Sequence, residues 1–154
     1  MREGVRLAVD VGSVRVGVAR SDPGGILASP LTVLRSGHLD ELATLVAGAD
    51  AIEVIVGLPT SLSGREGAAA AAARGFAAEL ASRLAPVPVR LVDERFTTTQ
   101  AHDALRRGGK DSRARRGTVD AAAAAVLLQA ALDTERATGN PPGQLVTLGG
   151  GASA

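Results

Sequence analysis

Asp10 is the residue whose position in the sequence points most directly to chemistry. It ends a near-continuous apolar run over residues 5–9, which predicts a buried strand, and Val11 and Gly12 follow it at once. An unpaired carboxylate buried in such a place costs several kcal/mol or shifts its pKa. A metal ion is one of the few partners that can stabilise it, so we expect Asp10 to be a metal ligand.

Two further acidic residues complete a candidate metal site. Glu94 ends another apolar strand, and Asp120 lies in the first turn of an Ala-rich segment with helical character. If the two strands end at the same sheet edge, the three carboxylates converge. Hard oxygen donors from separate elements suit Mg²⁺ or Mn²⁺. Two such ions can activate a water molecule and stabilise the leaving oxygen during phosphodiester hydrolysis.

Each additional acid also has an ordinary structural interpretation. Asp120 is near a helix N-terminus, where the helix dipole stabilises any carboxylate. Asp93 and Glu94 are equally compatible with a solvated strand end, in which Arg95 pairs with one of them. Taken singly, only Asp10 favours a functional role, and the convergence of the three acids is a hypothesis about the fold.

A cluster of basic residues lies between Glu94 and Asp120, interleaved with Gly108 and Gly109. Such a run is usually a solvated loop, but this one is tethered on both sides to candidate metal ligands. We therefore favour contact with a polyanionic backbone. The cluster consists of Arg106, Arg107, Lys110, Arg113, Arg115 and Arg116.

The turn after Asp10 allows two interpretations. Gly12 would let backbone amides approach a phosphate, as in a phosphate-binding loop. An ordinary hairpin turn requires the same residue type, and for this stretch alone we favour the hairpin.

The remaining pattern predicts an α/β domain with the element order β-β-β-α-β-α-β-α-α. Three tightly linked strands form an antiparallel meander, and Pro30 predicts a bulge or an edge position in the third. The following βαβ units then give a five-stranded mixed sheet with helices on both faces. The predicted strands cover residues 5–10, 14–20, 26–34, 52–58 and 87–92, and the predicted helices cover residues 39–46, 66–84, 97–107 and 118–137.

Composition limits the class of protein. The 154 residues favour one domain, for which we expect residues 1–138, with residues 139–154 as a disordered tail rich in Gly and Pro. The absence of cysteine excludes disulfides and zinc-thiolate sites, and fits a cytoplasmic protein. We expect neither a signal peptide nor a membrane span. Only two aromatic residues are present, so nucleic acid would be recognised through its backbone and shape.

Several ordered motifs together resemble the YqgF (RuvX) family over about residues 6–133. The most specific is Asp93-Glu94-Arg95-Phe96-Thr97-Thr98, which is similar to that family's Asp-Glu-Arg-Leu-Thr-Thr box. Two features depart from the family pattern: Phe96 replaces the usual Leu, and the loop at 60–67 is an uncommon version. These departures affect what the resemblance implies about the substrate, and leave the match of the three acids unchanged. The other matching segments are residues 8–19, 21–22, 28–31, 56–59 with Gly64, and 119–129.

The resemblance implies an RNase H-like fold and a metal-dependent nuclease. It places the catalytic and metal-binding acids on Asp10, Glu94 and Asp120, with Mg²⁺ or Mn²⁺ as cofactor. Members of the family are described as processing the 5′ end of pre-16S rRNA and as Holliday-junction resolvases. Structured RNA or branched DNA is therefore the expected partner. Arg15, Arg95 and the basic cluster are expected to bind its phosphodiester backbone.

Other functions remain open at this stage. The Asp-x-Gly turn also occurs in ATPases of the actin and sugar-kinase type, although these need two domains to close over nucleotide. A non-catalytic RNA-binding assembly factor would keep the acids for ions or structure. The protein could act as a monomer or a homodimer, and a twofold junction would require the dimer.

Overall fold

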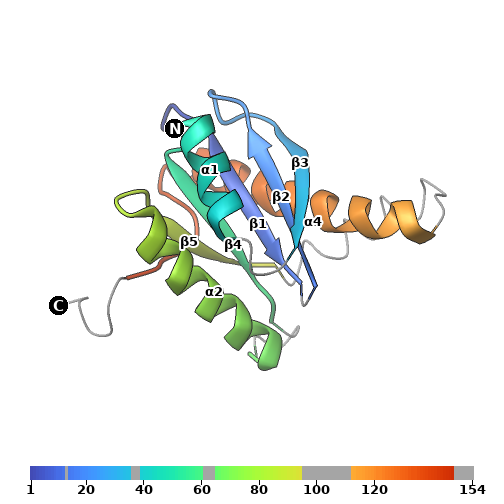
Figure 1. The fold of residues 1–154 in the computed structure, drawn as a ribbon. Coiled ribbons are helices and arrows are strands. Elements are labelled where there is room, and N and C mark those ends of the chain that lie inside the picture. The colour runs from blue at the N-terminus through green and yellow to red at the C-terminus, as the bar shows by residue number, and fades with distance from the viewer. Residues whose placement is uncertain (13, 36–38, 61–64, 95–111, 148–154) are drawn as a thin grey trace.

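The computed structural model describes residues 1–12, 14–35, 39–60, 65–94 and 112–147, and of residues 112–120 it describes the helical backbone alone. One sheet forms the centre of the molecule, with helices on both of its faces (Figure 1). Its elements are β1 (Arg6–Val11), β2 (Arg15–Ser21), β3 (Ala28–Arg35), α1 (Leu39–Ala49), β4 (Glu53–Leu58), α2 (Ala68–Leu84), β5 (Val89–Asp93), α4 (Ser112–Thr138) and β6 (Gln144–Leu145).

The strand order is β3-β2-β1-β4-β5-β6. The first three strands form the predicted antiparallel meander, and β1, β4 and β5 are parallel neighbours. Between β2 and β3 the register shifts where Ala19 pairs with Pro30, on the edge strand of the sheet. The bulge and the edge position predicted from Pro30 are both confirmed.

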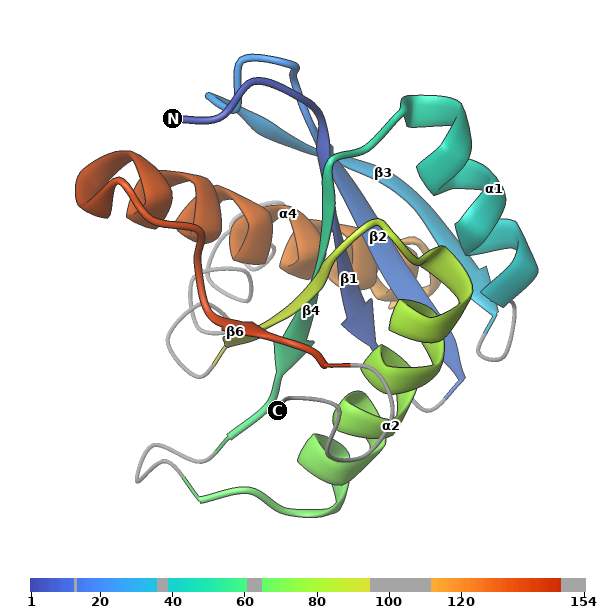
Figure 2. The same cartoon turned by 90° about the vertical axis from the view of Figure 1, so that its left-hand side faces the viewer.

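Strand alternation divides the apolar side chains into two cores. Leu7, Val9, Val54 and Val56 face α1 and α2, whereas the intervening side chains face α4. Figure 2 shows the two shorter helices on one side of the sheet and α4 on the other. The α4 side is lined by Ala8, Ala19 and Ile55 against Ala124, Leu127, Leu128, Ala131 and Leu132. Small side chains on both partners let this long helix lie close to the strands.

An ion-pair network is buried between the start of the parallel strands and the end of α4. Arg6 and Glu53, which are register partners, are fully buried, and Glu135 is only 3% exposed. The Arg2 guanidinium contacts Glu53 at 3.1 Å and Glu135 at 2.7 Å. Arg6 contacts Glu135 at 3.1 Å, and Arg90 contacts Glu53 at 3.0 Å. The network joins the N-terminal residues, three strands and α4, and the sequence pattern did not predict it.

The sheet has six strands rather than the predicted five, because β6 pairs antiparallel with β5. Val146 donates its amide to the Val89 carbonyl at 2.9 Å, and Gly143 adopts φ +68, where a side chain would collide with the Leu91 carbonyl. The expectation of a disordered tail is therefore wrong for residues 144–146, which cover the outer edge of β5. Residues 148–154 lie outside the described part of the chain.

Helix boundaries differ from the prediction in one further place. Among the described residues α4 begins at Ser112, six residues before the predicted start. The alanine and arginines that precede Gly117 favour helix, and an isolated glycine costs only about 1 kcal/mol within one. The predicted helix at 97–107 lies outside the described residues. In the described part of the chain, no helix is long and apolar enough to cross a membrane.

The buried network predicts a specific pH dependence of stability. Hydrogen bonding from Arg2 lowers the pKa of Glu135 to about 2. A carboxyl whose pKa is depressed on folding stabilises the protein above its ordinary pKa, and this stabilisation is lost as the pH falls towards the depressed value. We expect Glu135→Gln to lower the free energy of unfolding by about 3 kcal/mol at pH 7, because Arg6 is left buried without its partner. In urea titrations the difference from wild type should shrink between pH 4.5 and pH 2.

Glu79→Gln is the matched control, since Glu79 is exposed on α2. It should change stability by less than about 0.5 kcal/mol at either pH. Equal effects of the two substitutions would contradict a structural role for the network.

Candidate metal and nucleic-acid site

The carboxyl ends of the parallel strands bring two of the three predicted acids together. Asp10 is the penultimate residue of β1, and Glu94 directly follows β5. The central strand between them, β4, ends at Leu58, whose carbonyl accepts a hydrogen bond from the Glu94 amide at 3.1 Å. Because parallel neighbours end at one sheet edge, residues 84 positions apart in sequence become neighbours in space.

Both side chains project from the face that α4 covers. Ala8 belongs to the core under α4, and residues two apart on a strand share a face, which places Asp10 on that face. Ile55 pairs with Ala8, so Gly57 follows it on the same face of β4. A Cβ at position 57 would overlap the Glu94 carboxylate and would stand 3.1 Å from Leu127 of α4. Gly57 thus leaves open the space that the Glu94 side chain occupies.

Asp10 and Glu94 are neighbouring, half-buried acids. Burial raises the pKa of Glu94 to about 8, and the charge and hydrogen bond of Asp10 and the charge of Asp93 add to the effect. A buried pair of like charges favours a shared proton or a cation between the two groups. Carboxylate oxygens are the donors that Mg²⁺ and Mn²⁺ prefer, so Asp10 and Glu94 fit a divalent metal ion.

Asp120 is placed by its backbone only. It lies in α4, four residues before Ala124 and seven before Leu127, and therefore on the same helical stripe as these two buried residues. Among the residues whose side chains the structure describes, no group of three or more acids and histidines could hold a metal. The third ligand stays a prediction.

The turn after β1 is an ordinary hairpin. The Gly12 amide donates to the Arg15 carbonyl at 2.8 Å, so this amide is used within the turn. A Cβ at position 12 would stand 2.7 Å from that carbonyl oxygen, which explains the glycine. The hairpin prediction is confirmed, and it places Arg15 at the start of β2, two residues before the partner of Asp10.

The remaining predicted phosphate contacts are only partly located. Arg113, Arg115 and Arg116 lie in the first turns of α4, where the backbone alone is described. Arg95, Arg106, Arg107 and Lys110 lie outside the described residues. Their contact with nucleic acid stays a prediction.

Sequence reasoning missed one side chain that supports the site. Thr60, just after β4, donates its hydroxyl to Asp93 at 2.7 Å, beside Glu94. This bond ties the segment after the central strand to the end of β5. A threonine two residues beyond a predicted strand carries no local signal of such a partner, which comes from a strand 33 residues away.

Comparison with known proteins gives a consistent result. A family model described as RuvX, Holliday junction resolvase, matches residues 4–134. A Thermobifida fusca protein named "Putative pre-16S rRNA nuclease" is 62% identical, over 95% of this chain and 98% of that protein. A Nocardioides protein of the same name is 56% identical, over 95% of this chain and 98% of that protein.

A solved structure extends the likeness to the fold. The Thermus thermophilus RuvC chain, in complex with a Holliday junction substrate, aligns with a TM-score of 0.53 and 18% identity. The alignment covers 88% of this chain and 97% of the RuvC chain. At this identity the likeness concerns the fold alone, and it confirms the predicted RNase H-like architecture.

The contact between Gly57 and Glu94 predicts a sharp difference between two glycines. Gly57→Ala should destabilise the protein by about 1–3 kcal/mol through overpacking and should weaken Mn²⁺ binding, because the Glu94 carboxylate is displaced. Gly75→Ala, within α2, meets no atom within 4 Å and should stabilise by about 0.5–1 kcal/mol. Urea unfolding and calorimetric titration with Mn²⁺ measure both effects. Wild-type Mn²⁺ affinity in Gly57→Ala would show that the site does not need this space.

The raised pKa of Glu94 predicts that its carboxylate destabilises the metal-free fold at alkaline pH. A carboxyl whose pKa rises on folding binds more protons in the folded state, so stability falls as the pH rises from its ordinary pKa of 4.5 to about 8. In EDTA, Glu94→Gln should therefore melt a few degrees above wild type at pH 8 and close to wild type at pH 4.5. Thermal unfolding followed by circular dichroism measures this difference, with Glu79→Gln as the exposed control. A wild-type protein that melts higher than Glu94→Gln at pH 8 would contradict a buried acidic pair.

Proposed function

The chain belongs to the RuvX family and is a nuclease, and we propose that it hydrolyses a phosphodiester bond at the 5′ end of the 16S rRNA precursor. The observation that carries the proposal is the pair of acids, Asp10 and Glu94, half-buried together on one face at the carboxyl edge of parallel strands. Such a pair stabilises nothing by itself, because each acid raises the cost of ionising the other. It is suited to a cation that both acids bind.

The metal-binding residues in this proposal are Asp10, Glu94 and Asp120. A divalent ion bound there would polarise a phosphoryl oxygen and lower the pKa of a water molecule. Asp10 and Glu94 would supply two anionic carboxylates to that ion at the sheet edge. Gly57 keeps the Glu94 side chain in place by leaving room for it, and Thr60 holds the neighbouring Asp93.

We propose that the substrate is held mainly through its phosphates. Arg15 lies at the start of β2, on the same sheet face as Asp10. With only two aromatic residues in the sequence, base stacking can contribute little. The other proposed phosphate contacts are Arg95, Arg106, Arg107, Lys110, Arg113, Arg115 and Arg116.

Structured RNA is the substrate that we favour, because the relatives that match nearly the whole chain are named for pre-16S rRNA. The family description supports a second candidate, the Holliday junction. The two differ in what they require of the protein. One copy suffices for a single cut in RNA, whereas two symmetric cuts in a junction require a homodimer. Processing of rRNA places the proposed activity in the cytoplasm.

Asp10→Asn provides the direct test. It keeps the size of the side chain but removes the charge, so cleavage dependent on Mg²⁺ or Mn²⁺ should fall by at least about a hundredfold while the protein stays folded. Precursor 16S RNA and a four-way DNA junction should be compared in parallel as substrates, with each metal. Preferential cleavage of the junction would favour the resolvase alternative.

Asp50→Asn is the matched control for this substitution. Asp50 is exposed before β4 and has φ 51, a conformation that asparagine tolerates well. Its activity should equal that of wild type. Undiminished cleavage by Asp10→Asn would overturn the proposed site, and RNA binding without any turnover by the wild type would favour a non-catalytic assembly factor.

A further inference from the structure

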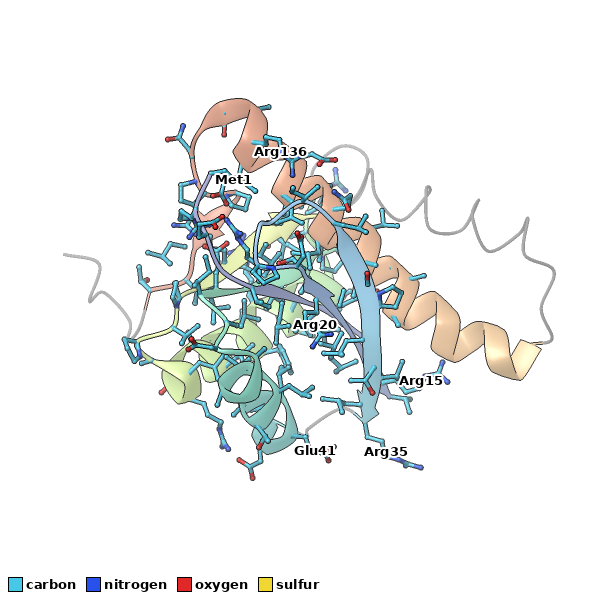
Figure 3. All side chains as sticks on the ribbon, turned by 90° about the horizontal axis from the view of Figure 1, so that it is seen from above. Met1, Arg15, Arg20, Arg35, Glu41 and Arg136 are labelled. Atoms are coloured by element: carbon cyan, nitrogen blue, oxygen red, sulfur yellow. The ribbon has the colours of Figure 1, made fainter. Side chains whose placement is uncertain are left out.

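The acidic face of the sheet continues into two arginines on the antiparallel strands. Arg15 of β2 and Arg35 of β3 are direct cross-strand partners, at the end of the hairpin nearest to Asp10. Arg15 shares its face with Gly17, which pairs with Asp10, so both arginines lie on the face that carries the acids. Figure 3 labels the two arginines at the same end of the two strands.

Two arginines placed opposite one another on neighbouring strands form a basic patch that suits an anion. Like charges directly opposite one another on neighbouring strands destabilise a sheet. Arg35 is exposed and makes no ion pair or side-chain hydrogen bond with any residue that the structure describes. A phosphate group that binds two neighbouring guanidinium groups would remove the repulsion, since arginine pairs with phosphate in a bidentate geometry.

Protection of the sheet edge is a different reason to place a charge on an edge strand. Here Pro30 already interrupts pairing along β3, and the register shift beside it distorts the edge. Arg35 instead ends the strand, beyond the reach of that bulge and opposite Arg15. The position of Arg35 therefore fits contact with the substrate better than it fits protection of the sheet edge.

We propose that Arg15 and Arg35 form a phosphate clamp for the RNA backbone, so that the substrate extends from the metal site across β2 to the outer edge of β3. Strands lie about 4.8 Å apart, so β3 is about 10 Å from β1. At that separation the clamp would bind a phosphate close to the scissile bond but not the scissile phosphate itself. The proposal rests on the proposed function for the identity of the substrate, and it assigns a role to Arg35, which the motifs did not single out.

The salt dependence of binding tests the clamp without any need for cleavage. The full chain is titrated, in EDTA, into a fluorescein-labelled hairpin RNA that carries the 5′ end of the 16S precursor. Each phosphate contact contributes about one unit to the slope of log affinity against log salt. We expect Arg15→Gln and Arg35→Gln each to reduce the slope by about one unit. The double variant should lose about two.

Arg20→Gln is the matched control. Arg20 is exposed on the same strand, but alternation places it on the opposite face of the sheet, with Val16 and Val18. It loses the same charge and should leave the slope unchanged. An Arg35→Gln slope equal to that of Arg20→Gln would overturn the clamp.

A labelled four-way DNA junction forms the second arm of the experiment and separates the two possible sources of phosphate. If Arg35→Gln changed the slope with the junction and not with the RNA, the assignment of RNA as the ligand would be overturned.

Cleavage by the wild type with Mg²⁺ or Mn²⁺ is measured separately. Normal cleavage with an unchanged Arg35→Gln slope removes the clamp alone, whereas a changed slope without cleavage removes the proposed function and leaves the clamp. Failure of the wild type to bind either probe would overturn the clamp, and cleavage with Mg²⁺ or Mn²⁺ would decide the proposed function separately.

Discussion

The placement of two half-buried acids side by side is the constraint on which the proposed site depends. Asp10 and Glu94 repel one another when both are ionised, yet the parallel order of β1, β4 and β5 forces their strand ends together. The central strand between them must also leave space, and Gly57 does so, because a Cβ at this position would overlap the Glu94 carboxylate. A site built on strand ends keeps this geometry because the strands are held by the sheet and by the packed helices.

The opposite end of the same sheet face shows how the fold treats buried charge when no site is required. There, Arg6 and Glu53 are fully buried, and each has partners of opposite sign in the network with Arg2, Arg90 and Glu135. The apolar core under α4 separates the two ends. Opposite charges are therefore paired at the amino ends of the parallel strands, whereas two acids of like charge lie side by side at their carboxyl ends. That contrast supports the proposed metal site at the carboxyl edge.

Local patterns were sufficient to predict most of the fold. The alternation of strands and helices, the hairpin at Gly12 and the bulge at Pro30 depend on neighbouring residues, and the structure confirms them. The approach of Asp10 to Glu94 could be predicted as well, because parallel strands bring their carboxyl ends to one edge.

What the sequence could not predict depends on partners far apart in the chain. Arg2 and Glu135 are 133 residues apart, and neither position differs locally from a solvated charge. The strand β6 follows a segment rich in Gly and Pro. Its two residues are too few to show the alternation of apolar and polar side chains that predicts a strand. The cross-strand position of Arg35 depends on a register that includes a bulge, so its relation to Arg15 cannot be counted along the sequence.

The hairpin after β1 is what couples the acidic and basic parts of the site. Asp10 and Arg15 are five residues apart, and the turn closed by Gly12 decides which face of β2 receives the arginine. A shift of one residue in this register would move every side chain of β2 to the other face. Arg15 would then leave the acidic face, and Val16 and Val18 would be turned out of the core on the α1 and α2 side. Core packing therefore fixes the register of β2, and that register in turn places Arg15 on the same face as the acids, as the proposed contact with a phosphodiester requires.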